Sequence, residues 1–243
     1  MHDVYSKLYS LQVEITLTSY DLAHLFQSVA DVLQAQRSAL NQVDSYNANH
    51  GDHMVAIFQD AILAAREHPT ENLAEAMTSA SRLLRQRSEN GSAQVYAVGL
   101  EQFALQFREH HVNLDDLVSY VQEVIKDDGA SSDRETQTNK VEHGEAKKDR
   151  SGSVLKALLG GLAGWQKAES GEDSEDSRLG MGYLFEVGIA YMQAKQRGGS
   201  KTEIIADAAV SVCPLNRVPH RSQSGKIAIQ VLLQAMRAKS DSV

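Results

Sequence analysis

The chain has 243 residues and a formal net charge of −8; 42% of its residues are hydrophobic and 23% are charged. These values are typical of an ordinary globular domain, and the negative balance argues against a general nucleic-acid binder. One cysteine, Cys213, fits a reducing compartment, and neither a signal-like N-terminus nor an apolar run of about 18 residues is found, so we expect a cytoplasmic protein without a membrane segment.

Apolar residues that recur at spacings of three and four predict amphipathic helices along most of the chain. The first strong stripe follows Ser19, whereas residues 1–18 form an N-terminal segment of uncertain structure. Polar breaks, prolines or glycines separate the later stripes, and strand signals are nearly absent. The helical stripes span residues 22–33, 54–63, 73–84, 95–107, 114–125, 154–165, 179–196, 202–212 and 227–236.

Two polar stretches interrupt the second half of the chain. We expect a flexible polar loop at about 127–152, because this stretch has few large apolar side chains to repay the entropy of ordering. A second polar gap lies at 169–176. Residues 19–238 are predicted to form a single all-α domain, an antiparallel barrel or bundle of about eight helices. Its core is expected to include Leu162, Trp165, Met181, Phe185 and Met192.

The most informative polar break lies between the first two helices, from Leu40 to Met54. It contains Asp44, His50, Asp52 and His53, and it ends where a helix begins. The first N–H groups of a helix are unpaired and its dipole favours negative charge, so a phosphate can dock there. Carboxylates nearby are the oxygen ligands that Mg²⁺ prefers. The segment therefore predicts a site for a metal-bound phosphate.

Three segments together carry a family resemblance. They are Leu40-Asn41 with Asp44 and Gly51-Asp52-His53, then Asn90 to Tyr96, and finally Val218 to Gly225. In this order they resemble the Leu-Asn-x-x-(Asp or Asn) and Asp-Gly-Asp-(His or Thr)-Gly motifs, the Gly-Ser-Ser-Gly-x-Leu-Tyr turn and the C-terminal Gly-His-x-Asp-Pro-Gly-type loop of one family. That family is the L-type (DhaL-type) nucleotide-binding domain of dihydroxyacetone kinases, with the related domain of fatty-acid kinases.

The resemblance implies a helical barrel that binds ATP or ADP through divalent metal and transfers phosphate to dihydroxyacetone or a similar small acceptor. Mg²⁺ is the implied metal, with Mn²⁺ as an option because of His50, and the implied ligands are Asp44, His50 and Asp52. Asp44, Asp52 and His53 are the implied catalytic residues. In this family a separate protein holds the acceptor, so we expect a DhaK-like partner, with homo-oligomerisation as a further option. The implied nucleotide contacts are His53, Met54, Ser92, His220 and Arg221.

Departures from the family pattern leave a second function open. His50 replaces an acidic ligand, and imidazole suits Mn²⁺ or Zn²⁺ better than Mg²⁺. Met54 and Ala93 replace family glycines, and the C-terminal loop lacks the family's aspartate. Each departure weakens the expectation of ordinary kinase activity. The alternative is a degenerate, non-catalytic nucleotide-binding or scaffold domain.

The proposed site residues also have purely structural explanations. Asp44 can shape an Asx-turn and Asp52 can cap a helix without any ligand. Ser92 can equally cap the helix that follows it, and an isolated loop arginine such as Arg221 is often a solvated surface group. The sequence leaves these alternatives open.

Overall fold

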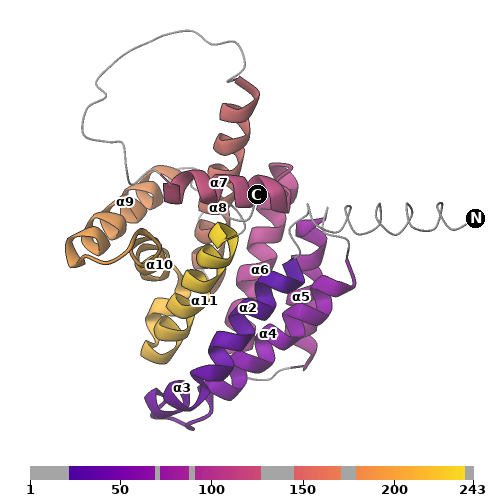
Figure 1. Cartoon of the computed structure of the whole chain (residues 1–243), viewed down its shortest axis with the longest axis vertical. Helices are drawn as coiled ribbons and strands as arrows, with labels where there is room; N and C mark the ends of the chain where they lie inside the picture. The colour runs from indigo at the N-terminus through magenta and orange to yellow at the C-terminus, as the bar shows by residue number, and fades with distance from the viewer. Residues whose placement is uncertain (1–21, 69–71, 88–90, 127–144, 171–178, 239–243) are drawn as a thin grey trace, which may run out of the picture.

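The computed structural model describes residues 22–68, 72–87, 91–126, 145–170 and 179–238. Within these ranges there are ten α-helices, one short 3₁₀ helix and no strand, which confirms the predicted all-α fold (Figure 1). None of these helices is both long and apolar enough to cross a membrane. The elements are α2 (Leu22–Ala35), α3 (Arg37–Val43), α4 (His50–Arg66), α5 (Leu73–Arg87), α6 (Gly91–Glu109), α7 (Leu114–Lys126), α8 (Glu145–Ser170), α9 (Leu179–Arg197), α10 (Lys201–Ser211), η1 (Pro214–Arg217) and α11 (Pro219–Ala238).

Eight of the helices pack in a closed circuit. Along it, α2 contacts α4, α4 contacts α5, α5 contacts α6 and α6 contacts α8. The circuit continues from α8 to α9, from α9 to α10 and from α10 to α11, which packs back against α2. The short α3 lies beside α4, while α7 contacts α8 and α11 and crosses one end of the bundle (Figure 1). This arrangement agrees with the predicted bundle of about eight helices.

The core is built from the apolar stripes that the sequence predicts. Leu33 of α2, Met54 of α4 and Leu84 of α5 are fully buried and belong to one hydrophobic cluster. Burying a side chain of this size stabilises the fold by roughly 1.5–3 kcal/mol. Phe26 and Phe58 meet edge to face in the same cluster, with ring centroids 6.1 Å apart. These stripes hold α2, α4 and α5 together and thereby position the start of α4.

The polar loop expected at about 127–152 is shorter than predicted, because α8 already begins at Glu145. Helix formers such as Glu, Ala and Lys fill its first turns. Arg150 then pairs with Asp116 of α7 at 3.4 Å, and Ser151 donates a hydrogen bond to Glu123 of α7. The last eight residues of the expected loop, 145–152, therefore belong to α8. The rest of the expected loop, 127–144, and the N-terminal segment lie outside the described residues.

Helix α9 differs from its prediction in the face that it buries. Trp165 of α8 is buried as expected, but Phe185 and Met192 of α9 are 71% and 55% exposed, so placing them in the core was wrong. Tyr183, Ala190 and Ala194 fill the buried side of α9 instead, against α10 and α8. Because the described helices that pack on α9 lie on one side of it, its second apolar stripe stays outside the core. The side chain of Met181, also predicted in the core, lies outside the described residues.

Candidate functional site

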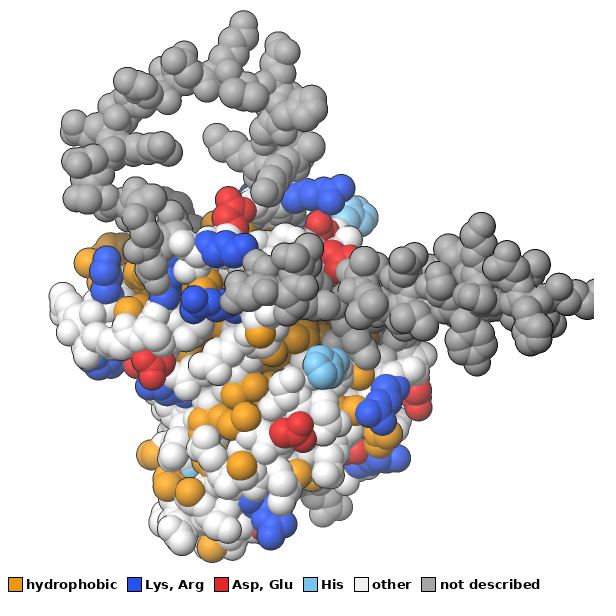
Figure 2. All heavy atoms as spheres, viewed as in Figure 1, with side chains coloured by type: hydrophobic (Ala, Val, Ile, Leu, Met, Phe, Trp, Pro, Cys, Tyr) orange, Lys and Arg blue, Asp and Glu red, His pale blue; other side chains and the backbone are white. Residues whose placement is uncertain are grey.

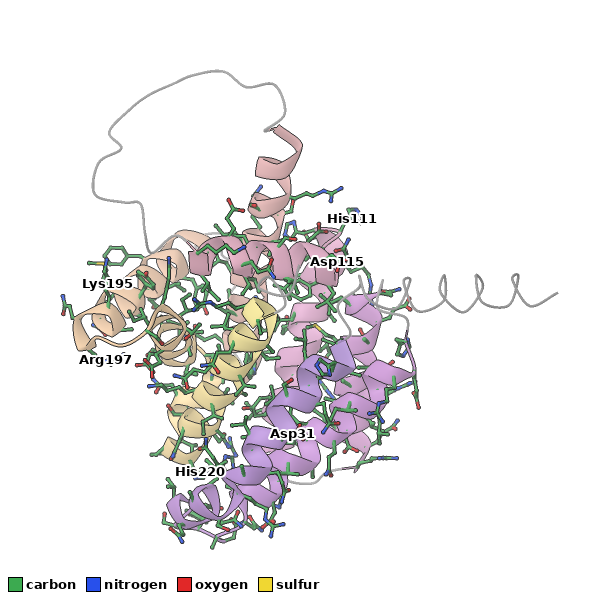
Figure 3. All side chains as sticks on the ribbon, viewed as in Figure 1. Asp31, His111, Asp115, Lys195, Arg197 and His220 are labelled. Atoms are coloured by element: carbon green, nitrogen blue, oxygen red, sulfur yellow. The ribbon has the colours of Figure 1, made fainter. Side chains whose placement is uncertain are left out.

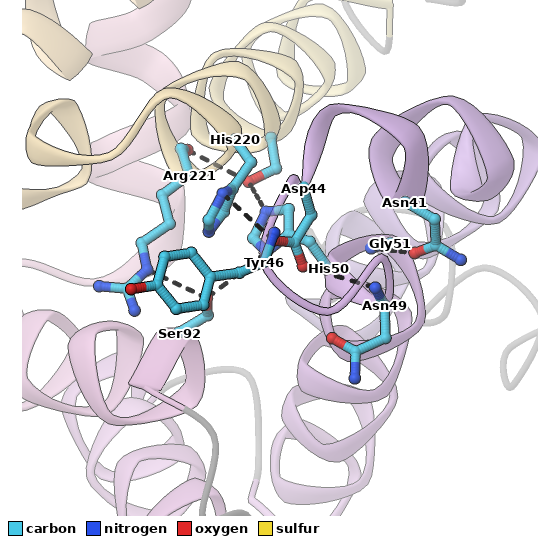
Figure 4. Close-up of polar contacts among 10 residues, drawn as sticks. Asn41, Asp44, Tyr46, Asn49, His50, Gly51, Ser92, His220 and Arg221 are labelled. Carbon is cyan, nitrogen blue, oxygen red and sulfur yellow. Dashed lines mark hydrogen bonds and ion pairs between the residues drawn. The ribbon is translucent and has the colours of Figure 1, made fainter.

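Three helices begin close together at one end of the bundle. They are α4, which starts at His50, α6, which starts at Gly91, and α11, which starts at Pro219 (Figure 4). Each helix start presents the positive end of a helix dipole. The first turns of α6 and α11 contain no acidic residue that would compensate this charge. We call the side chains that meet here, His50, Ser92, His220, Arg221 and Ser224, the helix-start cluster.

A closed hydrogen-bond circuit links the three helices of the helix-start cluster. Arg221 donates from Nε to Ser92 Oγ at 3.2 Å, and Ser92 Oγ lies 3.5 Å from His50 Nδ1. On the other side of the ring, His50 Nε2 lies 2.9 Å from Ser224 Oγ, which donates to the backbone carbonyl of Arg221 at 3.1 Å. Since the Ser224 hydroxyl proton points to that carbonyl, Ser224 accepts from His50. His50 therefore carries its proton on Nε2, and Nδ1 accepts from Ser92.

His50 is a buried, neutral member of the helix-start cluster. Its ring stacks on that of His220 with centroids 4.4 Å apart at a tilt of 52°. Burial, followed by the electrostatic effect of nearby His220, lowers the pKa of His50 to about 4, although Asp44 acts in the opposite direction. At neutral pH the imidazole is therefore uncharged, as the hydrogen-bond circuit requires.

This pKa predicts a pH dependence of stability. In the unfolded chain His50 titrates near 6.5, whereas in the folded protein it titrates near 4, so only the unfolded state takes up the proton between these values. Stability conferred by neutral His50 is fully present above pH 6.5 and is lost as the pH falls toward 4. The loss is on the order of 3 kcal/mol over this window. Urea unfolding at pH 7 and pH 4.5 measures it.

His50→Gln provides the control for this dependence, because glutamine keeps a hydrogen-bonding side chain that does not titrate. Its stability should fall less between pH 7 and pH 4.5 than that of the wild type. If the free energy of unfolding falls equally in the two proteins between pH 7 and pH 4.5, His50 is not the group responsible for the pH dependence.

Asp44 is buried beside the helix-start cluster and shapes the turn that leads into α4. Its carboxylate accepts backbone hydrogen bonds from Tyr46 N at 3.1 Å and from Asn49 N at 3.4 Å. Ala48 completes the turn with a left-handed φ of 54°. Burial raises the pKa of Asp44, but the backbone N–H donors and His220, whose Nδ1 lies 3.8 Å from Asp44 Oδ1, outweigh burial and hold the pKa below its ordinary value.

The start of α4 is capped by a side chain of α3. Asn41 Oδ1 accepts from Gly51 N at 2.7 Å and from Asp52 N at 3.3 Å, so these amides are not left free for a phosphate. Asn41 Nδ2 also donates to Asp52 Oδ2 at 2.8 Å, and Arg37 Nε lies 3.4 Å from Asp52 Oδ1. A side chain at position 51 would collide with the Arg37 carbonyl, which explains the glycine there. Asp52 is thus about half exposed and tied to α3.

The three predicted metal ligands are not brought together as a metal site. Asp44 and His50 lie at the helix-start cluster, whereas Asp52 is bonded to Asn41 and Arg37. Both oxygens of Asp44 accept backbone N–H groups, and both ring nitrogens of His50 face serine hydroxyls. Over the described part of the chain, no group of three or more His, Cys, Asp or Glu side chains could hold a metal ion. The donor set therefore does not fit a divalent metal.

Of the predicted nucleotide contacts, the structure brings three together. Ser92, His220 and Arg221 all lie in the helix-start cluster. Met54 is fully buried in the core, where it is out of reach of a ligand. His53 lies partly buried in the first turn of α4, where its electrostatic effect adds to the lowering of the His50 pKa, but it forms no hydrogen bond with the cluster among the described residues. Sequence reasoning missed Ser224, which follows Arg221 by one helical turn and is fully buried.

Arg221 is the side chain of the cluster that is positioned to meet a ligand. Its guanidinium lies against the start of α6, with Nη2 2.7 Å from where a Cβ on Gly91 would be, so a larger residue there would push the guanidinium aside. Arg221 also stands in the first turn of its own helix, α11. No carboxylate among the described residues forms an ion pair with it. A cation at two helix N-termini is electrostatically unfavourable unless an anion joins it.

No family model, no curated protein and no solved structure matches this chain. The function is therefore argued from the geometry of the helix-start cluster.

Proposed function

We propose that the protein binds the phosphate groups of a nucleotide such as ADP or ATP at the helix-start cluster, without metal and without catalysis. The observation that carries this proposal is the position of Arg221, which adds a cation to the starts of α6 and α11 and has no carboxylate partner among the described residues. Phosphate oxygens would accept from the guanidinium and compensate both helix dipoles. His220, partly exposed beside Arg221, supplies a further donor.

The donor chemistry favours binding over catalysis. Phosphoryl transfer depends on positioning and on metal ions that neutralise the developing charge. In this chain the Asp44 carboxylate accepts a hydrogen bond within its own turn, and the His50 ring contacts two serine hydroxyls. The Asp52 carboxylate accepts a hydrogen bond from Asn41 of α3. Among the described residues no three such side chains are placed to hold one metal ion. This corresponds to the degenerate member of the dihydroxyacetone kinase L-type family that the sequence left open.

A phosphotransferase that acts on dihydroxyacetone, with a DhaK-like partner holding the acceptor, is the second candidate. One observation favours it: Asp44, Ser92 and the pair His220-Arg221 come from three distant segments, each selected by the family resemblance, and they lie together at the helix-start cluster. This candidate requires the Asp44 turn to open so that its carboxylate reaches Mg²⁺ or Mn²⁺.

Calorimetric titration of the full chain distinguishes these functions. We expect ADP and inorganic pyrophosphate to bind, with dissociation constants in EDTA and in Mg²⁺ that differ by less than about threefold, since Arg221 and the helix starts supply the positive charge. Binding that requires Mg²⁺ or Mn²⁺ would instead support the phosphotransferase, to be followed by an ATP-consumption assay. A folded protein that binds neither compound would exclude both functions.

A further inference from the structure

Helix α9 carries an exposed apolar stripe, which we call the α9 stripe: Phe185, Gly188, Ile189 and Met192. The three large side chains are 71%, 42% and 55% exposed, and Gly188 has open space where a side chain would be. The α9 helix lies at the outer edge of the bundle, where hydrophobic and basic side chains are exposed together (Figures 1 and 2). The stripe faces away from the buried residues Ala190 and Ala194.

The α9 stripe differs from the other exposed apolar residues of the described chain. Leu63, Leu105 and Leu155 stand singly on three different helices, which is ordinary for a protein surface. Val43 and Tyr46 are exposed at the end of α3 and in the turn after it, so they form no stripe along a helix. Phe185, Ile189 and Met192 instead follow each other at spacings of four and three, as in the contact face of a helix that packs on another helix. Large side chains on both sides of an open glycine form a surface of knobs and one hole.

We infer that the α9 stripe pairs with the same stripe of a second copy of this chain, the two helices running antiparallel about a two-fold axis near Ala190. Such an axis places Ile189 beside Ile189 of the second copy, and it seats each Met192 over the Gly188 hole of the other copy. One surface thus supplies both the knob and the hole, as an isologous interface requires.

The charges beside the α9 stripe favour this arrangement. Glu186 and Arg197 are eleven residues apart, about three helical turns, so they project from the same flank of α9. In an antiparallel two-fold pair the same flanks of both helices meet. Glu186 therefore comes within about one turn of Arg197 of the second copy. Lys195 and Arg197 lie at the outer end of α9 (Figure 3). Among the described residues, the ion pair of Arg197 is a long contact of 3.9 Å with Asp207.

The size of the α9 stripe sets the expected strength of this dimer. Three large side chains and their flanks bury less than the roughly 1,600 Å² that is usual for a stable complex. A dimer held by this surface should dissociate in the micromolar range. We expect sedimentation of the full chain to show a reversible monomer–dimer equilibrium, and Ile189→Glu to weaken it by at least about tenfold, because the change buries a charge in the interface. Leu105→Glu, at an exposed leucine of α6, is the matched control and should leave it unchanged.

Disulfide trapping tests the orientation. The only native cysteine, Cys213, is buried and does not compete. In Ile189→Cys the two cysteines, one from each copy, lie near the axis and are displaced by about 3 Å along the helices. In Phe185→Cys the two cysteines are displaced by about 15 Å. Mild oxidation should therefore link Ile189→Cys into dimers far faster than Phe185→Cys or Leu105→Cys.

Three results would overturn the inference. The first is a wild-type chain that sediments as a monomer at several hundred micromolar. The second is equally fast linking of Ile189→Cys and Phe185→Cys, which would exclude the antiparallel pair. The third is binding of the monomer to vesicles of anionic lipid that Ile189→Glu abolishes, which would assign the α9 stripe to a bilayer.

Discussion

Replacing Arg221 with alanine should weaken pyrophosphate and ADP binding by about 10- to 100-fold, the loss expected when charge-assisted hydrogen bonds to a phosphate are removed. Arg221 stands at the starts of two helices without an acidic partner among the described residues, so its guanidinium is already positioned for an anion. Calorimetry in EDTA measures the change. Arg221→Lys should recover part of the affinity, since it keeps the charge but loses the planar fork of donors.

Two controls separate this effect from a general loss of charge or of fold. Arg82→Ala removes an exposed arginine of α5, outside the helix-start cluster, and should leave binding unchanged. Thermal unfolding of Arg221→Ala should remain cooperative, because the side chain donates only one hydrogen bond within the cluster, to Ser92. If Arg221→Ala binds pyrophosphate as tightly as the wild type, the ligand does not occupy the starts of α6 and α11.

Replacing His50 with alanine should lower the free energy of unfolding by on the order of 3–5 kcal/mol, the largest effect on stability that we expect from any polar residue of the site. His50 is fully buried and joins α4 to Ser92 of α6 and to Ser224 of α11. Its removal leaves a cavity and takes a partner from two buried hydroxyl groups. Urea unfolding at pH 7 measures the change, with the same dependence of the unfolding free energy on urea concentration expected for both proteins.

His53→Ala is the matched control for His50→Ala. His53 lies three residues further along α4 and is only partly buried, so its replacement should cost less than about 1 kcal/mol. His50→Gln should fall between the two, since an amide can replace one of the two hydrogen bonds. An unchanged unfolding midpoint for His50→Ala would mean that the hydrogen-bond circuit contributes nothing to joining the three helices.

Most of the fold could be predicted from the sequence, but only part of the candidate site. The polar break before α4 was identified correctly as the place where a helix begins, because the return of apolar spacing is a local signal. Asp52 was assigned to a metal for the same local reason. The structure ties it to Asn41, since α3 folds back beside α4 and presents its amide to that helix start.

The partners of His50 could not be predicted, because they are distant in sequence. Ser92 and Ser224 lie 42 and 174 residues from it, and no periodicity links them. The Arg221 side chain in turn needs both the start of α11 and the small Gly91 of α6. Only the packing of three helices decides that these groups meet.

By itself, the sequence determined the all-helical character of this protein and the apolar faces of most of its helices, because spacing in a helix is encoded within a few neighbouring residues. Only the tertiary structure decided which polar side chains converge and which apolar face remains exposed. Phe185 and Met192 have the spacing of core residues, yet they lie on the surface because the circuit of helices closes on the other side of α9. Closure of that circuit depends on contacts between distant segments, which no local pattern contains.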